Sequence, residues 1–188
     1  MYHIHTSLGF VLSSKPYREA DRVYQIFTKE FGLISAIAQG IRFEKSKLRY
    51  SINDLQVSNF SLVHGKEFWR IVGAEAVNQP QNSKRIIVIL SKLSILLKRL
   101  IHGEEQNEII FNILAEIANL DINDPSLAEN IESLSVLQIL HQLGYIAKTK
   151  DNEDFFAGKV QDLAIDIDVT KRKIINQAIN SALKNSQL

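Results

Sequence analysis

The densest group of residues able to do chemistry lies between Arg42 and Tyr50, where four cations stand against one acid. Lysine and arginine neutralise phosphates, and aromatic rings such as Phe43 and Tyr50 offer faces on which nucleic-acid bases stack. This composition is typical of a loop that contacts nucleic acid. The alternative is a single helical turn in which Leu48 and Tyr50 plug one end of a barrel.

Evidence for catalytic chemistry is sparse. His3 and His5 share one side of a predicted strand and form a possible metal pair, but no third ligand is marked nearby. The chain has no cysteine, which excludes thiolate ligands, disulfides and a cysteine nucleophile. It also has no glycine-rich phosphate loop. We therefore predict no catalytic residue, no cofactor and no metal; a metal-dependent nuclease built on the histidine pair is the remaining enzymatic alternative.

The net charge of +1 hides an asymmetry along the chain. Residues 1–78 hold 10 Lys and Arg against 7 Asp and Glu, whereas residues 79–188 hold 12 against 14. A total near zero argues against a histone-like coat of positive charge but permits a local basic patch, which phosphate contact requires. The alternative is an ordinary solvated surface.

The elements that position these residues begin with five β-rich runs. The fourth run skips a step at Ser58-Asn59, which predicts a bulge, and alternation in the fifth sends either Phe68 or Trp69 inward, with Trp69 the expected core residue. Five short strands with glycine at the corners suit a closed barrel of the OB type, and an open five-stranded sheet fits the same pattern. The runs are Thr6–Ser13, Asp21–Lys29, Gly32–Gln39, Asp54–Val63 and Glu67–Ala76.

The rest of the chain has helical periodicity, with predicted helices over Ser83–Ile101, around Ile109–Ile117, from Asp124-Pro125 to Gly144, and from Asp168. The apolar stretch in the first of these is too short and too charged to span a bilayer, so we expect a cytoplasmic protein without a membrane partner. We predict an α+β chain, with a five-stranded OB-fold barrel in residues 1–78 and an all-α helical domain in residues 79–188.

Three blocks, in order and at the same spacing, resemble the RecO family of DNA recombination and repair proteins. They are residues 9–22 (GFVLSSKPYREADR), residues 27–40 (FTKEFGLISAIAQG), and Arg42 with residues 45–48 (KSKL). Residues 103–107 and 140–145 are similar to family landmarks in the helical part. The resemblance runs along nearly the whole chain.

The resemblance implies an N-terminal OB-fold, a C-terminal helical domain and no catalytic turnover. It also implies a recombination mediator that binds single- and double-stranded DNA, anneals complementary strands, and works with RecR and single-stranded-DNA-binding protein to help load RecA. Such a protein is expected in the cytoplasm, at the nucleoid when bound to DNA. The chain is short for the family and lacks the four cysteines of the zinc site that many relatives carry, so we predict no zinc.

The resemblance favours DNA contact by two groups of cations. The turn after the first strand is expected beside the Arg42–Tyr50 loop, where its cations extend the same face; surface pairing with Glu19 and Asp21 is their alternative role. The predicted DNA-binding residues are Lys15, Arg18, Arg22, Arg42, Lys45, Lys47 and Arg49.

A second candidate surface lies on the first helix. Lys92, Lys98 and Arg99 are predicted to receive the acidic tail of single-stranded-DNA-binding protein, with a solvated helix stripe as the alternative. If partner binding of this kind dominates, the protein is an adaptor of the recombination machinery with only weak affinity for DNA.

Overall fold

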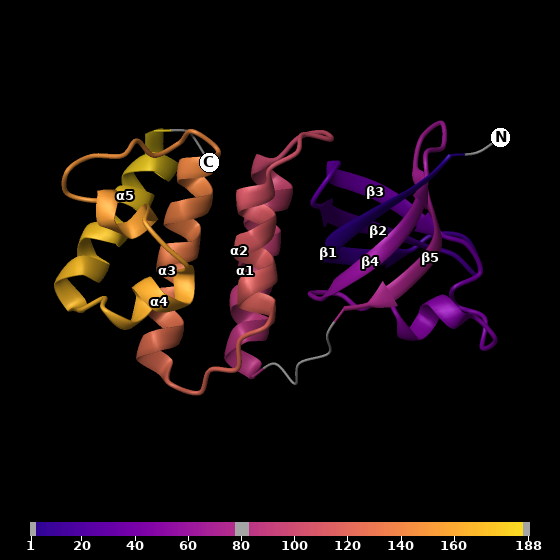
Figure 1. Cartoon of the computed structure of the whole chain (residues 1–188), viewed down its shortest axis with the longest axis horizontal. Coiled ribbons are helices and arrows are strands. Elements are labelled where there is room, and N and C mark those ends of the chain that lie inside the picture. Colours follow the sequence, from indigo (N-terminus) through magenta and orange to yellow (C-terminus); the bar gives the residue numbers. More distant parts are fainter. Residues whose placement is uncertain (1–2, 78–82, 186–188) are drawn as a thin grey trace. The chain divides into compact units, whose positions relative to one another are not determined.

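The computed structural model describes residues 3–77 and 83–185, and it confirms five strands followed by helices (Figure 1). The strands are β1 (Ile4–Pro16), β2 (Arg22–Thr28), β3 (Gly32–Ala38), β4 (Val57–Val63) and β5 (Trp69–Ala76), with a 3-10 turn η1 (Lys47–Tyr50) between β3 and β4. The helices are α1 (Lys84–Leu100), α2 (Glu108–Ala118), α3 (Pro125–Gln142), α4 (Val160–Ile165) and α5 (Val169–Asn185), with a 3-10 turn η2 (Glu153–Phe156) before α4. No helix within these ranges is long and apolar enough to cross a bilayer.

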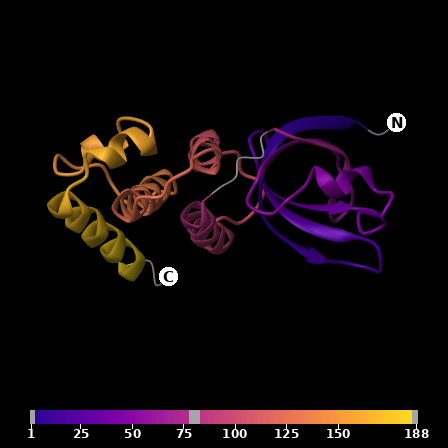
Figure 2. The same ribbon diagram turned by 90° about the horizontal axis from the view of Figure 1, so that it is seen from below.

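The five strands form a closed barrel in the order β1-β2-β3-β5-β4, which decides between the barrel and the open sheet (Figure 2). All neighbouring strands are antiparallel except β3 and β5, which pair in parallel at Ala36 and Trp69. The side chains of Phe10, Ile26 and Phe60 are fully buried in the interior. This is the OB-type barrel that the strand pattern predicts.

The predicted bulge at Ser58-Asn59 is wrong. Both residues pair regularly with β5, and the register shifts instead between Ser61 and Leu62. Ser58 is a buried residue in phase with Phe60, and its hydroxyl donates to the Ser51 carbonyl oxygen at 2.8 Å. A polar side chain fills a core position, so the apolar pattern breaks although the strand does not.

The chain forms two compact units. The first comprises residues 1–81 and 90–119, in which α2 packs against β1 of the barrel. The second comprises residues 82–89 and 120–188, in which α3 packs against α4 and α5. The predicted start of α3 is confirmed: the Asp124 carboxylate accepts hydrogen bonds from the backbone N–H groups of Ser126 and Leu127, with Pro125 as the first helical residue.

Candidate nucleic-acid interface

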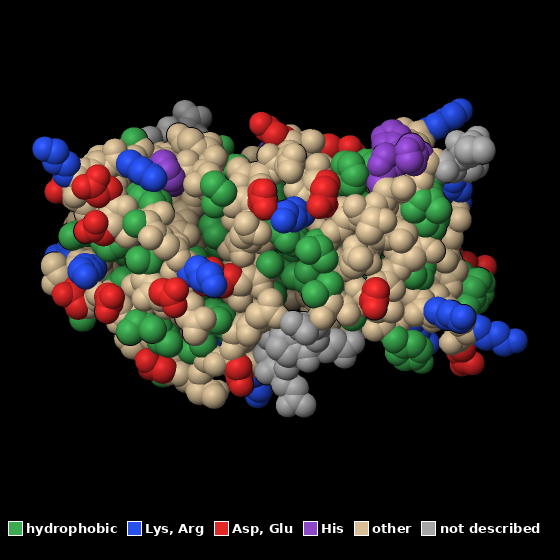
Figure 3. All heavy atoms as spheres, viewed as in Figure 1, with side chains coloured by type: hydrophobic (Ala, Val, Ile, Leu, Met, Phe, Trp, Pro, Cys, Tyr) green, Lys and Arg blue, Asp and Glu red, His purple; other side chains and the backbone are tan. Residues whose placement is uncertain are grey.

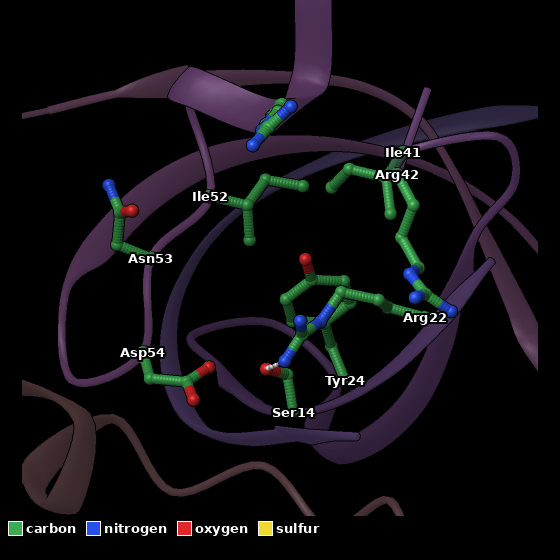
Figure 4. Close-up of a pocket in the computed structure, with 9 residues that line it drawn as sticks. Ser14, Arg22, Tyr24, Ile41, Arg42, Ile52, Asn53 and Asp54 are labelled. Carbon is green, nitrogen blue, oxygen red and sulfur yellow. Dashed lines mark hydrogen bonds between the residues drawn. The ribbon is translucent and has the colours of Figure 1, made fainter. Parts of the chain in front are cut away.

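A cavity of about 530 Å³ opens at the end of the barrel where the β1–β2 turn meets the connection between β3 and β4 (Figure 4). Backbone and side-chain hydrogen bonds join the turn to the connection. The Arg42 backbone N–H donates to the Ala20 carbonyl at 3.0 Å, and the Gly40 N–H donates to Asp21 Oδ1 at 2.8 Å. The cavity is lined by Ser14, Arg22, Tyr24, Ile41, Arg42, Arg49, Ile52, Asn53 and Asp54.

Three of the seven predicted DNA-binding residues, Arg22, Arg42 and Arg49, therefore share one cavity. The predicted neighbourhood of the β1–β2 turn and the basic loop (residues 42–50) is confirmed. Asp21 uses its carboxylate to hold Gly40, and Glu19 offers its backbone carbonyl to Arg42 Nη1 at 2.9 Å. Within residues 3–77 and 83–185, no carboxylate forms an ion pair with any of the three arginines.

Arg22 is the innermost of these cations. It lies on β2 opposite Pro16, and its Nη2 donates to Ser14 Oγ at 2.7 Å. Its Nε is buried and has no hydrogen-bond partner among the described residues. A buried guanidinium nitrogen without an acceptor is energetically costly.

Tyr24 also lies on the cavity wall, with its hydroxyl directed into the open space (Figure 4). Burial raises the pKa of this hydroxyl above its usual 10.0, the positive charge of Arg22 opposes that rise, and the negative charge of Asp54 adds to it. The tyrosine is therefore neutral at physiological pH. As a neutral phenol it remains available both to donate and to accept a hydrogen bond.

The other four predicted DNA-binding residues lie outside the cavity. Lys15, at the end of β1, and Lys45 and Lys47, in the basic loop, are exposed. The guanidinium of Arg18 is exposed and stands 5.2 Å from the centre of the Tyr17 ring. No ion pair engages any of these four side chains in the described part of the chain.

The basic loop combines the two interpretations that its sequence left open. Residues Lys47–Tyr50 form a single 3-10 turn, and Leu48 packs against the barrel core, as the plug interpretation predicts. Phe43 and Tyr50 are 64% and 71% exposed, as base stacking requires. Trp69 is buried and Phe68 is half-buried, which confirms that the tryptophan is the inward residue of the pair.

Sequence reasoning missed Ser14, Tyr24, Asn53 and Asp54 as wall residues. Asp54 was expected to begin a strand, but β4 begins at Val57, which leaves Asn53 and Asp54 in the connecting loop. Tyr24 stands among the buried apolar residues of β2, so its sequence context indicates only a core position. The signals in the sequence that point to this end of the barrel are the cations of the loop and those of the turn after the first strand.

The remaining candidates lie on α1 and at the start of β1. Lys92 and Arg99 are exposed on α1, whereas Lys98 Nζ donates to Ser13 Oγ of the barrel at 3.3 Å. The rings of His3 and His5 lie 5.1 Å apart, and the His5 ring also stands edge-on to the rings of Phe31 and Trp69. Among the described residues, no group of three or more His, Asp or Glu side chains converges to hold a metal ion.

Comparison with known proteins finds one family to which the chain is similar. Residues 1–80 match the family described as "Recombination protein O N terminal". A DNA repair protein RecO of Alkaliphilus metalliredigens is 30% identical over 139 residues, which cover 72% of this chain and 56% of that protein. The protein of the same name from Synechocystis is 41% identical over 75 residues, which cover 40% of this chain and 28% of that protein.

A third relative, the DNA repair protein RecO of Acaryochloris marina, is 31% identical over 113 residues, 58% of this chain and 39% of its own length. The chain thus spans between about a quarter and just over half of the length of these relatives. All of these matches are to proteins that carry the same name.

Proposed function

The chain belongs to the RecO family of DNA repair proteins, and we propose that it binds single- and double-stranded DNA at the arginine cavity and promotes annealing of complementary strands. The single observation that supports this proposal is the convergence of Arg22, Arg42 and Arg49 in one cavity without a paired carboxylate among the described residues. Guanidinium groups bind phosphate oxygens in a fixed fork geometry.

The mechanism that we propose is backbone-directed binding with stacking. The three arginines contact phosphates, and the exposed rings of Phe43 and Tyr50 receive bases, each engaged base adding roughly 1–3 kcal/mol. Annealing follows because cations between two strands reduce the repulsion of their phosphates. No step requires turnover of a small substrate, so we propose that the protein is not an enzyme.

The experiment that tests DNA binding is a salt titration of oligonucleotide affinity. We expect the variant in which Arg42, Lys45, Lys47 and Arg49 are all replaced by Ala to bind more weakly. The slope of log affinity against log salt concentration should become shallower by up to about 0.7 for each lost contact with a single strand. Unchanged affinity and an unchanged salt slope would show that this loop is not the DNA site.

The matched control removes the same charge elsewhere. Lys150, Lys159, Lys173 and Lys184 are exposed in the helical part of the chain. Their combined Ala variant changes the net charge by the same amount. We expect it to retain the affinity and the salt slope of the original chain, because these lysines lie outside the proposed DNA site. The control thus separates loss of DNA contacts from loss of positive charge in general.

We also propose that α1 contacts the partner proteins, single-stranded-DNA-binding protein and RecR, with which the chain would help to load RecA at the nucleoid. Lys92, Ile95 and Arg99 recur at helical spacing, so they share one face, and Ile95 is 64% exposed. Two cations around an exposed apolar side chain fit an acidic peptide that ends in an apolar residue. Lys98 contributes less, because its ammonium contacts the barrel.

A peptide titration tests this surface. The acidic tail peptide of single-stranded-DNA-binding protein should bind the unmodified chain, and Arg99→Glu should weaken the binding by about ten-fold while the charge-matched Lys173→Glu should not. Equal affinity of both variants would exclude this face of α1. Peptide binding with no measurable DNA binding would favour the adaptor function over the mediator.

A further inference from the structure

The barrel-end cavity contains hydrogen-bond acceptors as well as cations. Asp54 and Asn53 lie on the side of the cavity opposite Arg42, in the loop that precedes β4 (Figure 4). A site that binds only phosphate gains nothing from a carboxylate, because the like charges repel. The acceptors therefore suit a ligand that brings hydrogen-bond donors together with its negative charge.

The acceptor side is held in place by the backbone. Leu55, which directly follows Asp54, has a φ of 63°, a conformation that is uncommon for a residue with a branched side chain. Its N–H donates to the Val11 carbonyl at 2.8 Å, and the Val11 N–H donates to the Gln56 carbonyl at 3.0 Å. Two hydrogen bonds to a fully buried strand residue thus fix the loop that carries Asp54. Strained backbone of this kind is concentrated at functional sites.

Asn53 is also oriented as an acceptor. Its Nδ2 donates to Gln56 Oε1 at 3.1 Å, a hydrogen bond in which its Oδ1 takes no part. This oxygen lies on the cavity side of the amide (Figure 4). The Asp54 carboxylate is exposed and makes no ion pair within the part of the chain that the structure describes. Two consecutive residues, Asn53 and Asp54, therefore offer oxygen acceptors at one edge of the cavity.

The arginines that line the cavity have more N–H donors than their hydrogen bonds within the barrel use. Arg42 uses one N–H on the Glu19 carbonyl, and Arg22 uses one on Ser14 while its buried Nε has no partner among the described residues. Each guanidinium carries five N–H donors, so both retain donors for phosphate oxygens. Between the two sides, the buried residues Ile41, Ile52 and Tyr24 supply apolar wall. A volume of about 530 Å³ is within the range of small-molecule sites.

We propose that this cavity receives one unstacked nucleotide of a bound strand and prefers a base with an exocyclic amino group over thymine. The arginines bind the phosphate, and Asp54 and Asn53 accept hydrogen bonds from the base. Cytosine and adenine present amino donors at N4 and N6, whereas thymine presents a carbonyl oxygen at the same position. The inference rests on the proposed function, because it requires that DNA reach this end of the barrel.

The test compares the affinities of the full chain for (dC)15 and (dT)15 at one salt concentration and neutral pH. Because oligonucleotides differ in their own flexibility, the decisive quantity is the affinity ratio and its change on mutation. We expect Asp54→Asn to lower the dC-to-dT affinity ratio by roughly five-fold, the lower end for one base contact. The exposed Glu75→Gln on β5 removes the same charge outside the cavity and should leave the ratio unchanged.

The outcomes separate this inference from the proposed function. An unchanged ratio in Asp54→Asn, with DNA binding intact, overturns the base preference and leaves the DNA-binding proposal standing. Absence of binding to either oligonucleotide overturns both. A second measurement uses dCMP alone: the NMR signals of the Tyr24 ring should shift in the original chain and shift less in Asp54→Asn, whereas equal shifts in both contradict base contact by Asp54.

Discussion

Gly32, at the start of β3, is a position where one added carbon atom meets a distant part of the chain. Its φ is +66°, and a Cβ there would lie 2.1 Å from the backbone oxygen of Glu105. We expect Gly32→Ala to lower the free energy of unfolding by clearly more than the roughly 1–2 kcal/mol that a left-handed backbone costs other residues. Urea unfolding of the purified chain measures this change.

The control for Gly32 is Gly103, which has a φ of +94° and no described heavy atom within 4 Å of the place that a Cβ would occupy. Gly103→Ala therefore suffers the backbone cost alone. If Gly32→Ala is no more destabilising than Gly103→Ala, the loop around Glu105 does not press against the barrel in solution.

Tyr24 makes stability depend on pH at the alkaline end. Burial raises the pKa of its hydroxyl above 10.0, so between pH 10 and the folded-state pKa the unfolded chain binds fewer protons than the folded one. The Tyr24 contribution is fully present below pH 10 and is lost as the pH rises through that window. We expect Tyr24→Phe to flatten the fall of the urea midpoint above pH 10.

A second group titrates in the same alkaline window. The hydrogen bond and charge of Glu108 raise the pKa of Lys29, whose contribution also declines as the pH rises. Tyr24→Phe should therefore reduce the alkaline slope without abolishing it. Identical slopes in the two proteins between pH 9 and pH 11 would contradict the assignment to Tyr24.

At the scale of elements, the loop between α1 and α2 is attached to the barrel by polar contacts. Trp69 Nε1 donates to Glu104 Oε1 at 2.9 Å, and Lys29 Nζ lies 3.0 Å from Glu108 Oε1. Because the chain has one tryptophan, its fluorescence reports this attachment directly. We expect Glu104→Ala to shift the Trp69 emission to longer wavelength, since the indole N–H then turns to water.

Glu105→Ala is the matched control for the loop. The Glu105 side chain is exposed, and it is the backbone of this residue that approaches Gly32. We expect its Trp69 emission to match that of the original chain. Equal shifts in both variants would mean that the spectrum responds to lost charge rather than to the hydrogen bond.

The elements themselves were largely predictable, because their signals are local. Alternation in the strands and the Asp124-Pro125 start of α3 identify β1 to β5 and α3. The sequence did not predict the short turn η2 or helix α4, which lie in and after an irregular polar stretch. The bulge was misplaced because Ser58 is polar and yet buried.

The cavity was only half predictable, for a different reason. Its cations cluster in the sequence, but its wall joins residues from β1, β2 and the loop before β4. Loops have no periodicity that fixes where Asn53 and Asp54 point. Their positions depend on two backbone hydrogen bonds with Val11, more than forty positions earlier in the chain: the Leu55 N–H donates to the Val11 carbonyl, and the Gln56 carbonyl accepts from the Val11 N–H.

At the scale of the whole molecule, net charge sets how strongly the chain attracts DNA from a distance. A net charge of +1 steers DNA only weakly at long range, and Figure 3 shows basic and acidic side chains interspersed on the face in view. The proposed DNA binding therefore depends on local contacts at the cavity.

The two compact units should respond separately to a local defect. In the second unit, buried Asn130 joins three helices: its Nδ2 donates to the carbonyl oxygens of Ala164 at 3.0 Å and Ile167 at 2.9 Å, and its Oδ1 accepts from Arg172 Nε at 2.7 Å. Asn130→Ala removes all three bonds and leaves buried groups unpaired, at a cost of about 1–3 kcal/mol for each such group.

Hydrogen exchange across the whole chain measures the consequence. We expect Asn130→Ala to accelerate amide exchange in α3, α4 and α5 while the strands of the barrel keep their protection, because no described contact of Asn130 reaches the first unit. The exposed Asn176→Ala on α5 serves as the control and should change neither part. Loss of protection in the barrel as well as in the helices would show that the two units unfold as one, and that the cavity owes its stability to the helical part.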